Sequence, residues 1–542
     1  MFLRGIASLY SFQLPAALVA KLREQRFSPL GLLRWFWQTK SFRFNARLTD
    51  ADQSVMVLLW LGMLAQLAFG IGFLVAWARF GTAGTWEFGV ALLLSYPLVG
   101  VHLLAVGASI GWLVYFLFHP KKAGRAVVCG ILERQVTALR KRHDFKVVAV
   151  AGSVGKTSTK LAIAELLGQS LRVRHQAGNY NDRVTVPLVF FGHDEPNILN
   201  ALAWLRIFRA NSRAIKRSYP YGVVVVELGT DTPGTMADFA YVRPDITVLT
   251  AVSAEHMEFF GTLDAVAAEE LAIFDYSRQV LLNADDIAGK YLAGREFVTY
   301  SLTSKAADYF AATKAKGLEG QALAITTPAG TLNAEVAYIG KQGAKFALAA
   351  AAAADMLGVK SSTIAQGLTR LKHFAGRMQV LPGAEGVTLI DDTYNASPLA
   401  AKAALDVLYV AKTSQRIAIL GSMNELGDYS RQAHEEVGAY CDPKKLDVVV
   451  TIGADAEKWL APAAKKQGCT VHSFASPYEA GAFVRSHLKP GAVVLAKGSQ
   501  NGVFAEEALK QLLADSKDAS KLVRQSAHWL KVKSQQFPAR PQ

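Results

Sequence analysis

Two long apolar stretches near the N-terminus stand apart from the rest of the hydrophobic pattern. Residues 55–77 form 23 consecutive uncharged residues, and residues 88–118 form a second uncharged run of 31. A helix needs about 20 apolar residues to cross the hydrocarbon core of a bilayer. The pattern therefore predicts a transmembrane hairpin over 55–120, with two spans, or with three if the second run divides near Pro97 and Gly100.

Basic residues on both sides of these stretches predict how the hairpin is oriented. Four precede the first stretch, three follow the second, and the connector 78–87 has one: Arg34, Lys40, Arg43, Arg47; Lys121, Lys122, Arg125; and Arg79. Positively charged flanks stay in the cytoplasm. We therefore expect a multi-pass protein of the cytoplasmic membrane whose later domains face the cytoplasm.

After Arg142 the pattern changes to short apolar runs that alternate with helical periodicity. The expected strands are 146–151, 222–228, 245–251, 279–282, 387–391, 416–421, 447–452, 469–473 and 491–496. This alternation is typical of an α/β fold with mainly parallel sheets, and a turn-rich seam near residue 380 separates two blocks. The predicted organisation is a basic segment 1–54, the hairpin 55–120, a linker 121–145, a central domain 146–380, a C-terminal domain 381–515 and a basic tail 516–542.

The charge distribution limits the possible binding partners of the protein, and the cysteines indicate its compartment. The net charge is +15, with eight Lys and Arg against Glu24 in residues 1–49 and six against Asp518 in 516–542. Positive charge on the flanks of an apolar region predicts contact with membrane lipid, and no nucleic-acid recognition module is present to suggest nucleic acid. Cys129, Cys441 and Cys469 have no metal-ligand spacing and fit a reducing compartment.

The stretch "VVAVAGSVGKTSTKLAIAELL" (147–167) joins an expected strand to an expected helix through a glycine turn. It is shorter than the general phosphate-loop pattern G-x-x-x-x-G-K-[ST], because Val150 stands where that pattern has its first glycine. Backbone N–H groups at a helix N-terminus bind anions, Lys156 adds a positive charge, and the Thr157 hydroxyl is a ligand for Mg²⁺. We therefore predict a phosphate site here, with a plain glycine turn as the alternative.

Two polar residues follow the ends of other expected strands. Glu227 ends "VVVVE", and His256 lies in "SAEHMEFFG" just after the strand 245–251. Ligands bind at the carboxyl ends of strands in open α/β sheets. Both residues are candidate metal ligands beside the loop, although a solvated strand end and a structural histidine are the simpler alternatives.

Nine pieces of sequence occur in an order that is similar to one known family. They are "GSVGKTS" (152–158), "GNYNDRVTVPL" (178–188), "VELGTDTPG" (226–234), "PDITVLTAVSAEHMEFFGTLDAVA" (244–267), "LNADD" (282–286), "GRMQV" (376–380), "DDTYNASP" (391–398), "GSMNELGDYSRQAHEEVG" (421–438) and "KGS" (497–499). The chain resembles the Mur ligases, which use ATP to form peptide bonds in peptidoglycan precursors. The resemblance implies that a P-loop-type central domain and a Rossmann-like C-terminal domain follow the hairpin.

The resemblance also implies roles for single residues. ATP would bind the residues of the phosphate loop, one residue near the adenine and two residues at the seam. Mg²⁺ would be bound by residues of the loop and of the strand ends. Further polar side chains would bind the acceptor and the amine. These sets are Gly152, Ser153, Gly155, Lys156, Thr157, Ser158, Asn283, Arg377 and Asp392 for ATP; Thr157, Glu227, His256 and Glu270 for Mg²⁺; and Asn179, Asn181, Asn395 and Ser499 for substrates. Lys156, His256, Glu270, Arg377 and Lys497 are the expected catalytic residues. The expected partners are a muramyl-peptide acceptor and an amino acid or dipeptide that supplies the amine.

Three departures from the family pattern leave alternatives open. Glu270 stands where relatives have a carbamylated lysine, and a glutamate already has the carboxylate that carbamylation creates; otherwise the second metal site is degraded. The family's sugar-nucleotide domain is missing before the loop, which favours a lipid-linked or other acceptor over a nucleotide-linked one. Ser397 stands where asparagine is common, which leaves the amine open. A catalytically impaired, ATP-binding scaffold for cell-wall enzymes is the alternative function.

Two further basic segments allow two interpretations each. The segment between Asp194 and Tyr221, and the tail with Trp529 and Leu530, combine apolar and basic residues. Each is either an amphipathic helix on anionic lipid or an extra helix that packs on its domain.

Overall fold

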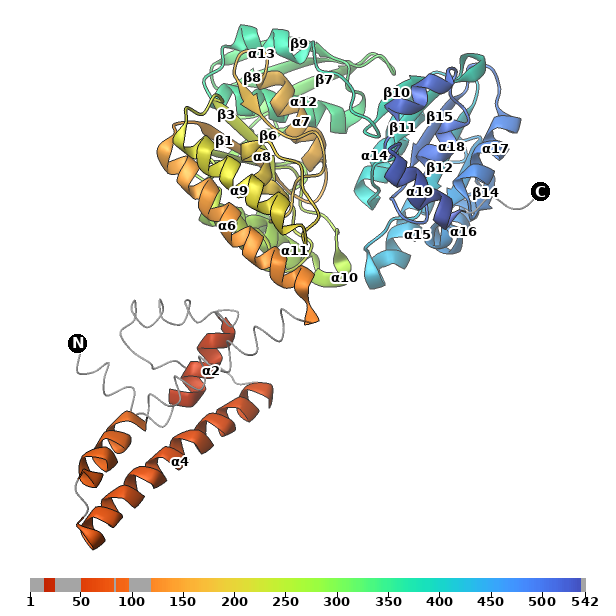
Figure 1. Cartoon of the computed structure of the whole chain (residues 1–542). Helices are drawn as coiled ribbons and strands as arrows, with labels where there is room; N and C mark the ends of the chain where they lie inside the picture. The colour runs from red at the N-terminus through yellow and green to blue at the C-terminus, as the bar shows by residue number, and fades with distance from the viewer. Residues whose placement is uncertain (1–13, 25–49, 82–83, 97–117, 538–542) are drawn as a thin grey trace. The chain divides into compact units, whose positions relative to one another are not determined.

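The structure is a computed structural model and describes residues 14–24, 50–81, 84–96 and 118–537 (Figure 1). The chain forms two compact units, residues 1–127 and residues 128–542. Helix α6 (Pro120–Arg142) begins in the first unit and ends in the second.

The first unit contains a helical hairpin. Helix α2 (Leu14–Glu24) packs against α4 (Asp50–Phe80), and a helix over 85–96 returns antiparallel to α4. Gln66 Nε2 donates to Ser95 Oγ at 3.0 Å, and the rings of Phe73 and Phe88 meet edge to face. Glycines let the two helices approach closely, since a Cβ on Gly89 would lie 3.0 Å from the carbonyl oxygen of Gly70.

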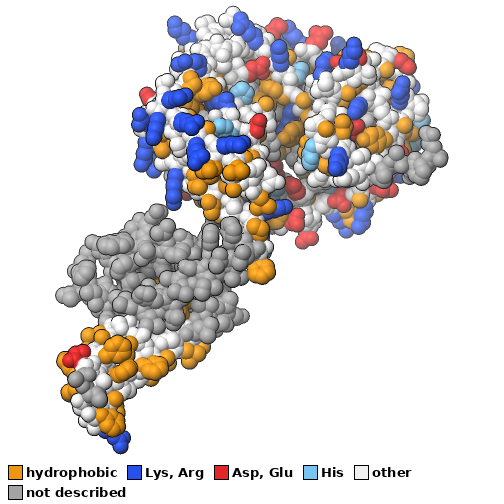
Figure 2. All heavy atoms as spheres, in the orientation of Figure 1, with side chains coloured by type: hydrophobic (Ala, Val, Ile, Leu, Met, Phe, Trp, Pro, Cys, Tyr) orange, Lys and Arg blue, Asp and Glu red, His pale blue; other side chains and the backbone are white. Residues whose placement is uncertain are grey.

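The described residues test the membrane prediction only in part. Hydrophobic side chains lie on the surface of α4 (Figure 2). Among the described residues, one helix, Leu59–Phe80, is long and apolar enough to cross a membrane. Of the second apolar run, only residues 88–96 and 118 are described, so the second and third predicted spans fall largely on residues 97–117, which lie outside the described residues. With one candidate span among the described residues, the predicted transmembrane hairpin is not confirmed and the predicted multi-pass localisation is corrected.

The central part of the second unit is built on a nine-stranded sheet with the order β2-β3-β1-β4-β5-β6-β7-β8-β9. Strands β1 to β7 pair in parallel, and β7, β8 and β9 form an antiparallel meander. The strands are β1 (Lys146–Ala151), β2 (Val173–Arg174), β3 (Val223–Glu227), β4 (Ile246–Leu249), β5 (Val280–Asn283), β6 (Val298–Ser301), β7 (Tyr309–Ala315), β8 (Gln321–Thr327) and β9 (Gly330–Val336).

Helices cover both faces of this sheet (Figure 1). One face packs against α7 (Lys156–Leu167), α12 (Gly340–Met356) and α13 (Ser361–Leu368). The other packs against α6, α8 (Thr185–Phe191) and α11 (Leu263–Glu270). Strands buried on both faces require almost continuous apolar sequence, which explains the uninterrupted valines and alanines of β1 and valines of β3.

The C-terminal part has a six-stranded sheet with the order β10-β11-β15-β12-β13-β14, in which only the β10–β11 pairing is antiparallel. The strands are β10 (Gln379–Pro382), β11 (Thr388–Asp392), β12 (Arg416–Gly421), β13 (Val448–Ile452), β14 (Val471–Phe474) and β15 (Val493–Lys497). Helices α14 (Pro398–Val410), α15 (Ser430–Tyr440) and α16 (Ala461–Lys466) cover one face, and α17 (Pro477–His487) and α18 (Glu506–Lys510) cover the other.

The predicted α/β fold with two sheet-containing blocks is confirmed, and every strand expected from an apolar run overlaps an observed strand. The meander β7–β9 was not predicted. Its strands alternate buried and exposed positions, as in β9, so they lack the continuous apolar runs on which the prediction relied.

Both ambiguous basic segments are helices packed on their own domain. Helix α9 (Ala201–Lys216) buries Trp204 against Leu132 and Leu188, and its Asn211 bonds to Gln135 on α6. Helix α19 (Ala527–Gln536) in the tail buries Lys533.

Candidate active site

The phosphate loop lies between β1 and the N-terminus of α7, as predicted. Gly152 and Gly155 have φ angles of 116° and 87°, which favour glycine. A Cβ on Gly152 would lie 2.5 Å from Thr250 Oγ1, and one on Gly155 would lie 2.9 Å from the ring of Phe346. The short loop is therefore fixed by neighbouring structure on both sides.

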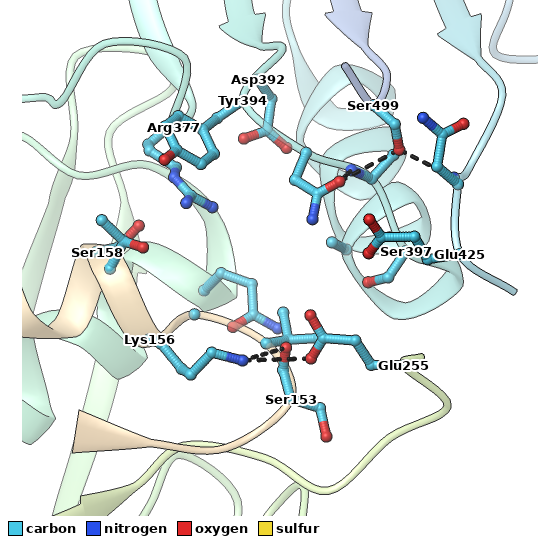
Figure 3. A pocket seen from close by; sticks show the side chains of 18 of the residues that line it. Ser153, Lys156, Ser158, Glu255, Arg377, Asp392, Tyr394, Ser397, Glu425 and Ser499 are labelled. Atoms are coloured by element: carbon cyan, nitrogen blue, oxygen red, sulfur yellow. Dashed lines mark hydrogen bonds and ion pairs between the residues drawn. The ribbon is translucent and has the colours of Figure 1, made fainter. Parts of the chain in front are cut away.

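A pocket of about 610 Å³ opens on this loop, between the central and C-terminal sheets (Figure 3). Its lining includes every predicted site residue except Gly152, Glu270 and Asn283. These lining residues are Ser153, Gly155, Lys156, Thr157, Ser158, Asn179, Asn181, Glu227, His256, Arg377, Asp392, Asn395, Lys497 and Ser499. Residues more than 300 positions apart thus face one space.

Thr157 and Glu227 meet at the base of the pocket. The Thr157 hydroxyl donates to Glu227 Oε1 at 3.1 Å, and Asn181 Nδ2 donates to the same oxygen at 3.4 Å. Lys160 Nζ lies 3.2 Å from Glu227 Oε2, although burial lowers the pKa of this lysine despite the carboxylate. The parallel register places Val150 of β1 opposite Glu227, which explains how the strand end reaches the loop.

This pair fits one Mg²⁺. A buried carboxylate and a hydroxyl are the oxygen ligands that Mg²⁺ prefers, and Mg²⁺ usually binds through one or two protein groups plus phosphate oxygens and water. Glu227 Oε2 lies 3.2 Å from Lys160 Nζ. A carboxylate oxygen accepts more than one partner, so Mg²⁺ would share this oxygen with Lys160.

Lys156 is paired with a glutamate that the sequence analysis did not single out. Lys156 Nζ lies 3.3 Å from Glu255 Oε2 and 3.4 Å from the carbonyl oxygen of Ser153, and Figure 3 shows both contacts. Burial opposes the charge, but Glu255, Glu270 and Glu227 outweigh it and raise the pKa of Lys156. The sequence could have indicated Glu255, because it directly precedes the candidate ligand His256.

His256 faces carboxylates rather than forming a metal cluster. Its Nδ1 lies 3.1 Å from Glu425 Oε2 of the C-terminal part, and its Nε2 lies 3.4 Å from Asp231 Oδ1. Burial disfavours the imidazolium, but Glu425, Glu255 and Asp231 raise the pKa of His256. Within the described ranges, no group of three or more His, Cys, Asp and Glu is arranged to hold a metal ion.

Glu270 lies behind the loop and not in the pocket lining. Its Oε2 accepts a hydrogen bond of 2.9 Å from the N–H of Gly152, and burial raises its pKa to about 7. The neighbouring Glu269 accepts from Thr230, Gly234 and Met236 and so holds the loop after β3. Glu270 therefore contacts the backbone of the phosphate loop, and its expected role with His256 at a second metal ion remains a prediction.

Asn283 is also outside the pocket lining. Its Nδ2 donates to the Thr250 carbonyl and to Asp286, which in turn pairs with Lys345 at 2.7 Å. These bonds close the turn after β5, and the expected contact of Asn283 with adenine remains a prediction.

The C-terminal side of the pocket is assembled by strand pairing. Asp392 at the end of β11 and Lys497 at the end of β15 are register partners, and Lys497 Nζ lies 2.6 Å from Asp392 Oδ2. Lys497 also donates to the Asn395 carbonyl, and Ser499 Oγ donates to Asn395 Oδ1. All the C-terminal residues predicted for the site therefore form one hydrogen-bonded group.

Arg377 lies at the seam with an unused donor. Its guanidinium is 4.0 Å above the ring of Tyr394, and its buried Nε has no hydrogen-bond partner among the residues described. Figure 3 shows Arg377 and Tyr394 above the helix that follows the phosphate loop. A buried donor without a partner costs about 1–3 kcal/mol, which an anion would offset.

Comparison with known families identifies this arrangement. Residues 150–354 match the Mur ligase middle domain, and residues 376–500 match the Mur ligase glutamate ligase domain. The chain belongs to the Mur ligase family. It is thus an ATP-dependent ligase of the family that builds peptidoglycan precursors.

Individual Mur ligases give the same result. The chain is 27% identical to a UDP-N-acetylmuramoyl-tripeptide--D-alanyl-D-alanine ligase of Bacillus subtilis over 389 residues, which are 70% of this chain and 79% of that protein. It is 28% identical to the Escherichia coli enzyme of that name over 323 residues, 58% of this chain and 66% of that protein. Similarity to these ligases, together with one candidate span among the described residues, overturns the predicted multi-pass localisation, and the predicted membrane-lipid partner is not supported.

Solved structures show the same fold. MurF from Acinetobacter baumannii has a TM-score of 0.60 at 23% identity, covering 72% of this chain and 81% of that one. MurF from Thermotoga maritima in complex with ADP has a TM-score of 0.57 at 23% identity, covering 72% and 84%.

Proposed function

We propose that this Mur ligase joins D-alanyl-D-alanine, or a related amine, to the terminal carboxylate of a muramyl peptide, with conversion of ATP to ADP and phosphate. The relatives named for this reaction support the substrate class. The observation that supports the proposal most strongly is the pocket, because one space is lined by a phosphate loop and by the polar group of Asn395, Lys497 and Ser499.

The first step is phosphoryl transfer. A carboxylate oxygen of the acceptor attacks the γ-phosphorus, the bond to the β-γ bridging oxygen breaks, and an acyl phosphate and ADP form. Such steps depend on positioning and on neutralising spread negative charge. Lys156 supplies one positive charge, and the unpartnered Nε of Arg377 supplies a donor. Mg²⁺ held by Thr157 and Glu227 would neutralise further phosphate charge.

The second step forms the amide. The amine nitrogen attacks the acyl carbon, a tetrahedral intermediate collapses, phosphate leaves and the nitrogen loses a proton. We assign Asn395 and Ser499 to orient the amine, and Lys497 to hold the Asp392 carboxylate beside the nucleotide. Asn179 and Asn181 line the acceptor side of the same pocket.

Water has to be excluded while the acyl phosphate exists, because it would hydrolyse this intermediate. Contacts across the pocket, such as His256 with Glu425, bring the C-terminal part over the phosphate loop. We assign this covering role to the C-terminal part.

The test is the release of ADP by the purified full-length protein with ATP and Mg²⁺. Nucleotide-linked and lipid-linked muramyl tripeptides are offered in parallel, each with D-alanyl-D-alanine, and products are identified by mass. An amide product from either acceptor supports the proposal and names its carrier. ATP binding without turnover on either acceptor contradicts it and favours a scaffold.

A matched pair of variants connects turnover to the pocket. Arg377→Met removes the unused donor and should lower turnover at least about tenfold, since a single positioned donor is worth 10²–10³ in rate in favourable cases. Arg370→Met removes an exposed arginine seven residues earlier and should leave turnover unchanged. Equal effects of the two changes would contradict the assignment of Arg377.

A further inference from the structure

The tail after residue 515 is an integral part of the C-terminal domain, although the match to the family's domain ends at residue 500. Lys533 of α19 is buried, and its Nζ lies 2.9 Å from Glu506 Oε1 and 2.7 Å from Glu507 Oε1, both on α18. Figure 1 shows α19 lying on the same domain as α18. Charged groups are buried in this way only when they are paired, so the tail is fixed by these contacts.

Arg524, between the last strand and α19, uses its whole guanidinium. Its Nε and Nη2 bind the two oxygens of Glu506 at 2.9 and 3.1 Å. Its Nη1 donates to the Tyr394 carbonyl at 3.0 Å, and its Nη2 also donates to the Thr393 carbonyl. The planar fork of arginine suits several acceptors held at fixed angles, which lysine does not match.

The two carbonyls belong to the loop that supplies the active site. Strand β11 ends at Asp392, so Thr393 and Tyr394 have left the sheet when they meet Arg524. On one side of them Asp392 pairs with Lys497, and on the other Asn395 bonds to Ser499. The hydrogen bonds from Arg524 to the carbonyls of residues 393 and 394 therefore also fix the positions of Asp392 and Asn395.

The tail also contacts the seam. A Cβ on Gly376 would lie 2.7 Å from Val523 Cγ1 and 3.1 Å from the Tyr394 nitrogen, so the tail packs closely against the first residue of the C-terminal domain match. Tyr394 stacks under Arg377, and the Arg524 guanidinium lies 5.9 Å from the same ring.

We propose that Arg524 is a positioning residue of this ligase, which holds the loop 393–394 so that Asp392, Asn395 and Arg377 face the nucleotide and the amine. The inference rests on the proposed function for its kinetic consequence. Its first consequence is for ATP affinity, which does not depend on which acceptor the enzyme uses.

The main test is Arg524→Lys in the full-length protein. Lysine keeps the charge beside Glu506 but cannot bind both carbonyls as well, so we expect a folded protein with a thermal midpoint close to wild type. We expect ATP to bind about tenfold more weakly, which corresponds to the loss of about one hydrogen bond to the nucleotide. Arg524→Ala should be weaker still, and Lys521→Ala, an exposed change in the same tail, should match wild type.

ATP affinity is measured by titration without acceptor, and kcat and KM are measured with the acceptor that works best. Weaker ATP binding by Arg524→Lys at a wild-type thermal midpoint supports the proposal. Wild-type affinity and kinetics in Arg524→Lys overturn it, whether or not Arg524→Ala folds, and leave Arg524 as a stabilising ion pair. Absence of turnover in the wild-type protein, with ATP binding intact, counts against the proposed function alone.

Discussion

The two walls of the nucleotide pocket are built in different ways. The phosphate-loop wall comes from one contiguous stretch, residues 152–158, whose shape follows from two glycines and a helix N-terminus. The C-terminal wall is assembled from Asp392, Lys497 and Arg524, which are brought together by strand pairing and by the tail. The difference teaches that the first wall owes its function to local geometry, whereas in the second wall the buried Asp392–Lys497 ion pair contributes to both function and stability.

The sharpest test of this difference is Lys497→Met. Lys497 and Asp392 are both buried, and removing one partner of a buried ion pair typically costs about 3–5 kcal/mol. We expect the free energy of unfolding, measured in urea, to fall by about that amount and turnover to be lost. The double change Lys497→Met with Asp392→Asn should recover part of the stability but none of the turnover. If Lys497→Met lowered the free energy of unfolding by less than about 1 kcal/mol, the C-terminal wall would contribute no more to stability than the phosphate-loop wall.

The matching change in the other wall is Lys156→Ala. Its ion pair with Glu255 is more exposed to water than the Lys497–Asp392 pair, so we expect its loss to cost less stability, about 1–2 kcal/mol. Turnover should nevertheless fall about 10²–10³-fold, because the charge on the transferred phosphoryl group loses its partner. Rates of ADP release check the expected loss of turnover, and urea unfolding curves of the same preparation check the expected stability. Loss of stability comparable to that of Lys497→Met would contradict the comparison.

A buried carboxylate in the C-terminal wall links stability to pH. Asp391 accepts hydrogen bonds from Gly376 and Thr393, and burial raises its pKa to about 6. The folded state therefore holds a proton that the unfolded state has already lost, so stability should fall as pH rises from about 4 to 6, by on the order of 2 to 3 kcal/mol. Asp391→Asn should flatten this slope in unfolding curves measured at several pH values. An unchanged slope would assign the pH dependence to other groups.

The smallest expected effect concerns Glu270 behind the phosphate loop. Glu270→Gln keeps an acceptor for the Gly152 N–H, so turnover should stay within about threefold, whereas Glu270→Ala loses one hydrogen bond worth about 0.5–1.5 kcal/mol. The Mg²⁺ dependence of both variants should match wild type, and removal of CO₂ should change nothing. A Mg²⁺ requirement shifted strongly by Glu270→Gln would instead support the metal role expected from the sequence.

The sequence predicted those strands and site residues that are determined by a short stretch of neighbouring residues. Continuous apolar runs located the strands β1, β3 and β4, and the motifs located the residues that line the pocket. Contacts between distant segments were not accessible. Glu425 meets His256 across 169 positions and Arg524 meets Thr393 across 131, and no spacing in the chain signals either contact.

The basic segments could not be interpreted from their composition alone. Basic charge suggested contact with lipid, but basic residues also occur on helices that pack within a domain, such as α9 and α19. Lys533 shows this, because a lysine in a tail with a positive excess is fully buried between two glutamates. Charge counts describe a segment's composition and not which of its charges are paired.

Helix α12 has a consequence for how the pocket can change shape. Ala349 to Ala354 are fully buried, and α12 packs against α7, whose N-terminus forms the phosphate loop. Alanine has no side-chain rotamers, so its burial costs no rotamer entropy and offers no alternative packing. The interface behind α7 therefore offers few alternative side-chain packings, and we expect the phosphate-loop wall to keep its shape when ATP binds. Adaptation to different acceptors has to come from the loops of the opposite wall.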